Sequence, residues 1–195
     1  MQKLKTAVLI SGGGTNLQAL IDACNEPDFP AEIVLVLSNK ADAYGLERAK
    51  KAGINTAVIS HKDFSSREEF DRQMDKTILE SGAEFVCMAG FMRLLSGWFT
   101  QKWQGKLVNI HPSLLPSFKG INAQKQALDY GVKIAGCTTH FVTEEMDAGP
   151  IIAQACVDVA ENETAESLTA KILQKEHEIY AKTLRLVAEG KVSFQ

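Results

Sequence analysis

Short apolar runs alternate along this chain with longer segments in which apolar residues recur at helical spacing. The runs are strand-sized and rich in β-branched residues, so they predict buried strands. They lie at Thr6–Ile10, Ile33–Leu37, Thr56–Ile59, Phe85–Ala89, Leu107–Ile110, Ile134–Val142 and Ile151–Val159. The amphipathic segments predict helices at Asn16–Asn25, Gly45–Ala52, Ser66–Leu79, Ala123–Tyr130 and Thr164–Ala188, where Thr164 and Ser167 offer capping side chains.

This order of elements predicts the fold class. Strands that alternate with helices form βαβ units, whose parallel strands are covered by helices on both faces. The last two strands are joined by about ten residues without helical spacing, which favours an antiparallel pair. The 195 residues suit one domain. We therefore expect a single-domain α/β fold with a mostly parallel sheet, in which ligands bind beyond the carboxyl ends of the strands.

Composition and charge narrow the classes of function. Hydrophobic residues make up 45% of the chain, charged residues 23%, and the formal net charge is −3. Since no basic block occurs, binding of nucleic acid by phosphate neutralisation is not expected. The apolar runs are too short to span a membrane, and the segment from Met1 to Lys5 lacks the features of a signal peptide. We expect a cytoplasmic protein with no membrane or nucleic-acid partner.

The cysteines and histidines carry no metal signature. The cysteines are widely spaced without a CxxC pair, which predicts four buried, reduced thiols at Cys24, Cys87, Cys137 and Cys156. The histidines are His61, His111, His140 and His177, and no two have the HExxH spacing of a helical zinc site. We expect no metal.

A glycine-rich segment, Ser11–Asn16, separates the first predicted strand from the first helix. Such a turn lets backbone N–H groups and the helix dipole face an anion. It lacks the Gly-Lys-Ser/Thr of a Walker A loop, and Leu17 stands where a dinucleotide fingerprint needs its third glycine. These features favour a phosphate monoester, hydrogen-bonded by Thr15 and Asn16. The alternative is a tight turn in which Thr15 or Asn16 merely caps the helix.

Two polar residues end the fifth predicted strand, in the sequence Asn109-Ile110-His111-Pro112. Residues two apart on a strand face the same side, so Asn109 and His111 project together. An amide donor and an imidazole of adjustable acidity can polarise a carbonyl group and stabilise an oxyanion. The alternative for His111 is a loop histidine that is hydrogen-bonded only to backbone.

An aspartate lies between the last two predicted strands, in Asp147-Ala148-Gly149-Pro150. Its carboxylate can pair with His111 and favour the protonated ring. The alternative is a simple turn. Asn109, His111 and Asp147, without a nucleophilic Ser or Cys or a metal, indicate direct acyl transfer.

Four segments resemble the glycinamide ribonucleotide (phosphoribosylglycinamide) formyltransferase family. They are Ser11–Gln18, Ala89–Leu95, Asn109–Pro116, and His140–Val142 with Asp147–Pro150. The resemblance extends from the first strand to His177. It implies a formyltransferase fold with a Rossmann-like N-terminal half. Residues of about 1–100 would then bind the ribonucleotide phosphate, and residues of about 101–195 would provide catalysis and bind folate.

The resemblance also implies roles for individual residues. The implied catalytic residues are Asn109, His111 and Asp147. The residues implied to hold the ribonucleotide are Gly14, Thr15, Asn16 and Glu176. The residues implied to contact the folate are Arg67, Met92, Arg93, Leu94, Leu95 and Asn109. Without the resemblance, the charged residues would be interpreted as solvated helix or surface charges, and the apolar ones as core.

The implied reaction is transfer of a formyl group from the cosubstrate 10-formyltetrahydrofolate to the amine of glycinamide ribonucleotide, in purine biosynthesis. The segment Ile121–Lys125 departs from relatives that carry histidine there, so we expect no histidine-driven ordering of that loop. The oligomeric state is not predicted by the sequence.

Three alternatives to this reaction stay open. A formyltetrahydrofolate hydrolase would use water, but usually carries a further N-terminal regulatory domain, whereas the resemblance here starts near Lys5. A methionyl-tRNA formyltransferase would need an RNA-binding C-terminal domain and a basic surface. A non-catalytic nucleotide or folate binding module would not need Asn109, His111 and Asp147 together.

Overall fold

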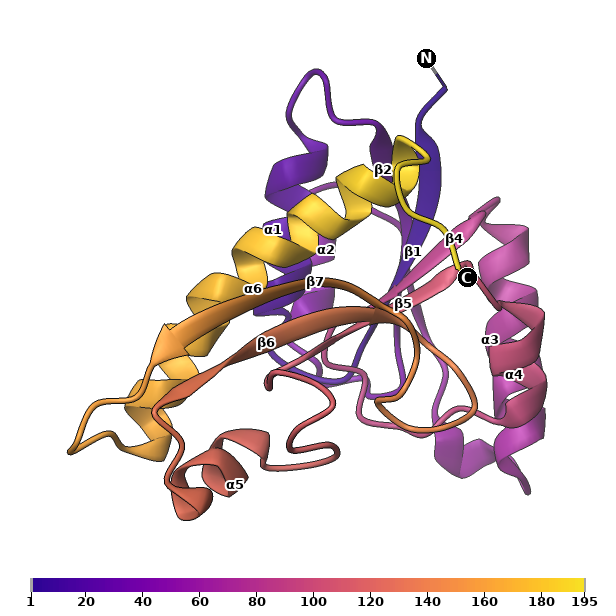
Figure 1. Ribbon diagram of the computed structural model, residues 1–195. Helices are drawn as coiled ribbons and strands as arrows, with labels where there is room; N and C mark the ends of the chain where they lie inside the picture. The colour runs from indigo at the N-terminus through magenta and orange to yellow at the C-terminus, as the bar shows by residue number, and fades with distance from the viewer. Residues whose placement is uncertain (1, 195) are drawn as a thin grey trace.

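The computed structural model describes residues 2–194, which form one seven-stranded sheet with helices on both faces (Figure 1). The spatial order of the strands is β3-β2-β1-β4-β5-β6-β7. Strands β1 to β5 pair in parallel, whereas β6 pairs antiparallel with both β5 and β7. The predicted α/β fold and mostly parallel sheet are confirmed, as is the antiparallel last pair. The strands are β1 (Leu4–Ile10), β2 (Ala31–Ser38), β3 (Thr56–Val58), β4 (Phe85–Met88), β5 (Leu107–His111), β6 (Ile134–Phe141) and β7 (Ile151–Asp158).

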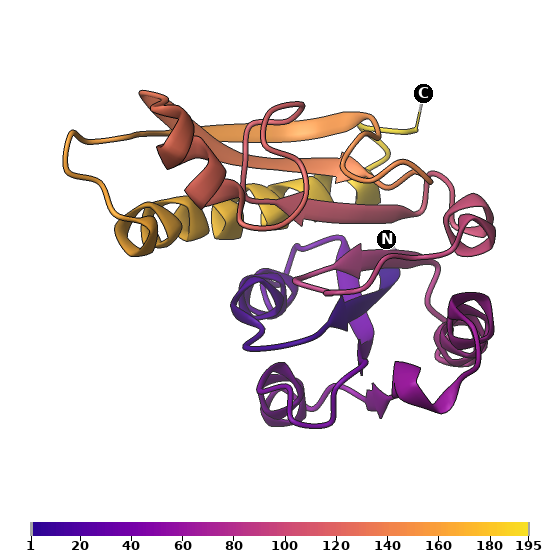
Figure 2. The ribbon, with the colours of Figure 1, turned by 90° about the horizontal axis from the view of Figure 1, so that it is seen from below.

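The helices form two layers. Figure 2 shows α1 and α2 on one side of the parallel strands and α3 and α4 on the other, while the long α6 lies along β6 and β7 and packs on α1. All five predicted helices are present, with ends within one residue of the prediction. The helices are α1 (Thr15–Cys24), α2 (Gly45–Lys51), α3 (Arg67–Glu80), α4 (Gly97–Lys102), α5 (Ala123–Tyr130) and α6 (Ala165–Ala188), and a 3₁₀ turn, η1, spans His61–Asp63.

Two of these elements, α4 and η1, were missed by the sequence analysis because they are too short to show a periodic pattern. Helix α4 also begins with Gly97, Trp98 and Phe99, which are weak helix formers. Its start is set by Ser96, whose side chain accepts the N–H of Phe99. The neighbouring α3 contributes as well, since the Asp71 carboxylate accepts the N–H of Ser96 at 2.6 Å.

Strand β1 shows why both faces of the sheet are covered. Val8 and Ile10 pack into a core cluster shared with α1, α2 and α6. Ala7 and Leu9 point the other way, into a second cluster shared with α3 and α4. Because both faces are buried, the strand is a continuous apolar run and shows no alternation of polar and apolar residues.

The prediction of four buried thiols is wrong for two of them. Cys87 and Cys137 are buried, but Cys24 is half-buried and Cys156 is exposed. Cys156 lies on β7, which is the last strand of the sheet and is covered by α6 on one face only, so its alternate residues face solvent. All four thiols are free.

Helix α6 begins at the predicted cap and is anchored at its middle. Thr164 and Ser167 form a capping box in which each side chain accepts the backbone N–H of the other. Further along, the fully buried Tyr180 donates its hydroxyl to the carbonyl oxygen of Met88 at 2.8 Å. Helix α6 is therefore attached to β4 by a hydrogen bond as well as by apolar contacts. In the part of the chain that the structure describes, no helix combines the length and apolar character of a membrane span.

We predict that Tyr180→Phe lowers the free energy of unfolding by about 0.5–1.5 kcal/mol, because it removes a buried hydrogen bond to the Met88 carbonyl. Urea unfolding with an unchanged m value measures this loss. Tyr130→Phe is the matched control, because Tyr130 is 80% exposed and its hydroxyl is solvated. Equal stabilities of the two variants would contradict the anchoring role.

Candidate active site

Three of the four predicted site segments follow the carboxyl ends of adjacent parallel strands. The glycine-rich segment follows β1, the Met92–Leu95 segment follows β4, and Asn109 and His111 end β5. Asp147 arrives by another route. Strand β6 ends with Phe141 opposite Val108 near the start of β5, so the next loop folds back over these strands to bring Asp147 to His111. The four segments thus meet where open α/β sheets bind ligands.

The glycine-rich segment leaves the start of α1 without a capping side chain. The N-cap is Gly14 with φ 71°, and no side chain among residues 2–194 caps the helix. The interpretation of a turn capped by Thr15 or Asn16 is therefore wrong. The first-turn N–H groups are free of a side-chain cap, as binding of an anion there requires.

Gly14 is required for both its conformation and its packing. Its φ lies in the left-handed region, and a Cβ atom there would lie 2.7 Å from the Cα of Gly45 on α2. Arg48 of α2 also holds the segment, since its Nε donates to the Gly13 carbonyl at 2.8 Å. Gly12 and Gly13, in contrast, face open space. Helix α2 therefore fixes the shape of the predicted phosphate loop.

Asn16 and Glu176 meet across the molecule. The Asn16 Nδ2 donates to the Glu176 Oε2 at 2.8 Å, although the residues are 160 positions apart. Glu176 is buried, which raises the pKa of its carboxyl group, and the hydrogen bond from Asn16 offsets only part of this effect. The Asn16 Oδ1 is buried and has no partner within residues 2–194. The pair thus presents an oriented amide oxygen and a buried carboxyl group beside the glycine-rich segment.

Asn109 is oriented by a histidine that the sequence analysis did not assign to the site. The antiparallel pairing of β5 and β6 sets His140 opposite Asn109, and the Asn109 Nδ2 lies 3.4 Å from the His140 Nε2. Burial lowers the pKa of His140, an effect that the Phe141 carbonyl and Asp147 partly offset. The Nδ1 of this neutral ring donates to the Phe141 carbonyl at 2.9 Å, so Nε2 can accept from Asn109.

His111 lies between two hydrogen-bond acceptors. Its Nδ1 is 3.4 Å from the Asp147 Oδ2, and its Nε2 is 2.9 Å from the carbonyl oxygen of Phe118. Asp147 adopts φ 52° and also accepts the N–H of Gly120 at 2.8 Å. The structure therefore places Asp147 beside His111, as predicted. Two acceptors suit a doubly protonated ring that donates from both nitrogens.

The Met92–Leu95 segment presents apolar side chains to solvent. Met92 is 70% and Leu94 54% exposed, so the interpretation of these two residues as core is wrong. Leu95 packs against the cluster shared with α3 and α4. Exposed large apolar side chains next to a group of polar residues are typical of a binding surface.

One arginine, Arg93, belongs to this segment, and a second, Arg67, lies on α3. Arg67 is exposed at the first turn of α3, and Arg93 is half-buried with its Nε lacking a partner among the described residues. Both act on the buried Asp71, whose pKa is raised by burial and lowered less strongly by Ser96 and by the two arginines. Arg67 and Arg93 therefore both lie near Asp71.

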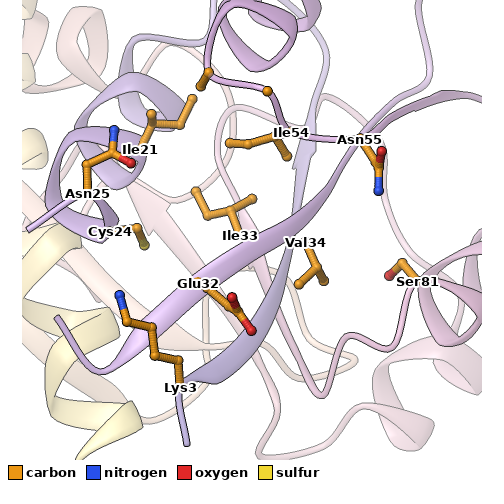
Figure 3. Close-up of a pocket in the computed structure, with 12 residues that line it drawn as sticks. Lys3, Ile21, Cys24, Asn25, Glu32, Ile33, Val34, Ile54, Asn55 and Ser81 are labelled. Atoms are coloured by element: carbon orange, nitrogen blue, oxygen red, sulfur yellow. The ribbon is translucent and has the colours of Figure 1, made fainter. Parts of the chain in front are cut away.

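Two cavities lie outside this group of residues. One, of about 500 Å³, opens at the amino ends of the strands, where Glu32, Cys24 and Asn55 line it (Figure 3). The other, of about 370 Å³, lies between α5 and the segment that follows His111. Neither contains Asn109, His111 or Asp147. Within residues 2–194, no group of three or more His, Cys, Asp or Glu side chains is placed to hold a metal ion.

The structure adds three residues that the sequence analysis did not assign to the site. His140 orients Asn109, the Phe118 carbonyl contacts His111, and the Ser11 hydroxyl accepts the N–H of Met92 at 2.8 Å. The alternation of residues on β6 offered a signal for His140 only if the pairing with β5 was known. The other two contacts depend on loop conformation and have no sequence signal.

Known proteins resemble the chain over nearly its whole length. Residues 4–184 match the family described as Formyl transferase. The chain is 44% identical over 189 residues to the phosphoribosylglycinamide formyltransferase of Escherichia coli (strain K12), which covers 97% of this chain and 89% of that protein. It is 55% identical over 190 residues, or 97% of the chain, to the trifunctional purine biosynthetic protein adenosine-3 of Gallus gallus, but spans only 19% of it. The solved glycinamide ribonucleotide transformylase 1 from Symbiobacterium toebii superposes with a TM-score of 0.97 at 47% identity, covering 99% of this chain and 91% of that one.

We predict that Glu176→Gln is more stable than the wild type at neutral pH, because it keeps an acceptor for Asn16 and removes a buried carboxylate. The pKa of Glu176 is raised in the folded state, so its destabilising effect is absent below the unfolded pKa and complete above the folded pKa. The advantage of the variant should therefore shrink as the pH falls through that raised pKa.

Urea unfolding at neutral and mildly acidic pH measures this difference. Glu161→Gln, at an exposed loop position, is the control and should show no comparable dependence on pH. If Glu176→Gln is no more stable than the wild type at neutral pH, the carboxyl group is not destabilised by its burial.

Proposed function

The chain belongs to the formyl transferase family, and from this premise we propose that it formylates 5-phosphoribosylglycinamide with 10-formyltetrahydrofolate as donor. The products are formylglycinamide ribonucleotide and tetrahydrofolate, in de novo purine biosynthesis. The observation that carries the proposal is the convergence of Asn109, His111 and Asp147 at the same edge of the sheet as the uncapped start of α1. Transfer of a formyl group to a phosphorylated amine requires hydrogen-bond donors for the formyl oxygen and a site for the phosphate. Asn109 and His111 offer the donors, and the start of α1 offers the phosphate site at the same edge of the sheet.

The acceptor would bind at the glycine-rich segment. The phosphate would face the backbone N–H groups of Gly14, Thr15 and Asn16, where the dipole of α1 favours negative charge. Glu176 and the free Oδ1 of Asn16 would accept hydrogen bonds from the rest of the ribonucleotide. Because the phosphate is remote from the amine, binding it can hold the amine close to the formyl carbon without taking part in the reaction.

The donor would bind along the Met92–Leu95 segment. The exposed Met92 and Leu94 offer apolar contacts to the folate ring system. The exposed Arg67 offers a positive charge for the carboxylates of the folate. Arg93, whose Nε lacks a partner among the described residues, belongs to the Met92–Leu95 segment and would contribute further hydrogen bonds.

The chemistry follows from the donors at β5. The amine attacks the formyl carbon, and the formyl oxygen gains negative charge that Asn109 and His111 stabilise. Asp147 holds the His111 ring in the orientation that its donors need. Collapse of the tetrahedral intermediate breaks the bond between the formyl carbon and the folate nitrogen. In net terms the amine loses one proton and the folate nitrogen gains one.

The segment around Phe118 must move for the donor to bind. The Phe118 carbonyl oxygen now accepts from the Nε2 of His111. In the proposed reaction the formyl oxygen takes over this hydrogen bond, since both groups are carbonyl acceptors. Phe118 adopts φ 54°, which is unfavourable for an aromatic residue, so its release relieves backbone strain.

The proposal includes the cellular setting. We place the enzyme in the cytoplasm, which is supported by its four free thiols. Its partners would be the two small-molecule substrates, without nucleic acid, membrane or metal. The other activities of the trifunctional relatives are not part of the proposal, because the chain spans only 19% of the Gallus gallus protein.

The decisive test compares transfer with hydrolysis. We predict that breakdown of 10-formyltetrahydrofolate by the protein alone is slow, and that adding phosphoribosylglycinamide accelerates release of tetrahydrofolate by about a hundredfold or more, because the acceptor amine is then held close to the formyl carbon. Tetrahydrofolate is followed by absorbance and the formylated product by mass spectrometry. Rapid formate production that the ribonucleotide does not change would establish a hydrolase instead.

A second test concerns the catalytic residues. We predict that His111→Ala, Asn109→Ala and Asp147→Ala each lower kcat about a hundredfold or more while the fold, checked by circular dichroism, is retained. Asn55→Ala and Asp158→Ala are controls of matched residue type, at exposed positions away from the site. A kcat near that of the wild type in His111→Ala would refute this mechanism.

A further inference from the structure

Ser11 lies between the two proposed substrate-binding segments. It follows the last residue of β1, is 5% exposed, and its hydroxyl accepts the N–H of Met92 at 2.8 Å. The same oxygen is 2.6 Å from the Oδ1 of Asn39, which follows β2 and is 3% exposed. One hydroxyl therefore joins the segments that follow β1, β2 and β4.

The direction of each hydrogen bond is determined by the chemistry of the groups. The backbone N–H of Met92 can only donate, so Ser11 accepts it and directs its own proton to the amide oxygen of Asn39. The Nδ2 of Asn39 then faces the Nδ1 of His61 at 3.4 Å. The Ser11 hydroxyl is thus held in one orientation by partners on both sides.

The link joins the two segments that must be held in a fixed relation to each other for the reaction. Within residues 2–194, the bond from Met92 to Ser11 is the sole hydrogen bond between the Ser11–Asn16 segment and the Met92–Leu95 segment. Gly14, at the proposed phosphate site, is three residues from Ser11 along the chain. Met92 is the first residue of the proposed donor segment.

We propose that Ser11 is a positioning residue that fixes the distance between the bound amine and the bound formyl group. The inference rests on the proposed function, because it assigns one substrate to each segment. Ser11 need not touch either substrate. Without its hydroxyl, the Met92 N–H and the Asn39 amide oxygen lose their shared partner, and the two segments can shift independently. A misplacement of about 1 Å can lower a rate about a hundredfold.

The test is Ser11→Ala, with kcat and KM measured for each substrate. We expect kcat to fall by about 10-fold to 100-fold, while each KM stays within about threefold of the wild type, because each segment still binds its own substrate. A larger share of the formyl group should also reach water and appear as formate. A purely structural role would not raise that share.

Two further variants keep the test decisive. Thr6→Val removes another buried hydroxyl from β1, at the end of the strand far from the site, and should leave kcat and the formate share unchanged. Asn39→Ala removes the acceptor of the Ser11 proton, together with the Nδ2 that faces His61, but keeps the bond from Met92 to Ser11. It should shift kcat and formate in the same direction by a smaller factor, which serves if Ser11→Ala does not fold.

The outcomes separate this inference from the proposed function. Absence of transfer by the wild type would reject the proposed function, whatever the variants do. If the wild type transfers formyl groups, a kcat within twofold of wild type in Ser11→Ala, or a defect confined to one KM, overturns the positioning role. An unchanged formate share in both Ser11→Ala and Asn39→Ala overturns it as well.

Discussion

Strand β5 has a parallel neighbour, β4, on one edge and an antiparallel neighbour, β6, on the other, and the site depends on this change of direction. The parallel side brings His111 to the edge where the segments after β1 and β4 lie. The antiparallel side sets His140 opposite Asn109. Because β6 runs backward, its following loop must return over the strands, and this return carries Asp147 to His111.

The same edge holds several titratable groups that burial drives toward their neutral forms. Burial lowers the pKa of His140 and raises the pKa values of Glu176 and Asp71. Each group is also oriented by a hydrogen bond. His140 donates to the Phe141 carbonyl, Glu176 accepts from the Asn16 amide, and Asp71 accepts from the Ser96 N–H. Such groups cost stability, but their dipoles are already oriented before a ligand arrives. The stability of the protein and the order of its site are therefore coupled.

The sequence by itself determined the elements and part of the site. The apolar runs predicted all seven strands. In central strands such as β1 the run is continuous because strands buried on both faces need apolar residues at nearly every position. Alternation along a strand put Asn109 and His111 on one face, and the absent Walker and dinucleotide patterns removed two classes of nucleotide site. These inferences depend on neighbouring positions alone. The roles of the predicted site residues stay predictions.

Only the tertiary structure decided which distant residues meet. Asn16 and Glu176 are 160 positions apart in the sequence. Ser11 and Met92 are separated by 81 positions, and Asn109 and His140 are separated by 31. Local pattern carries no information on strand register, on the path of the loop that bears Asp147, or on the Phe118 carbonyl beside His111. The exposure of Cys156 likewise follows from the place of β7 at the edge of the sheet. Each of these features arises from contacts between segments, which exist only once the sheet has formed.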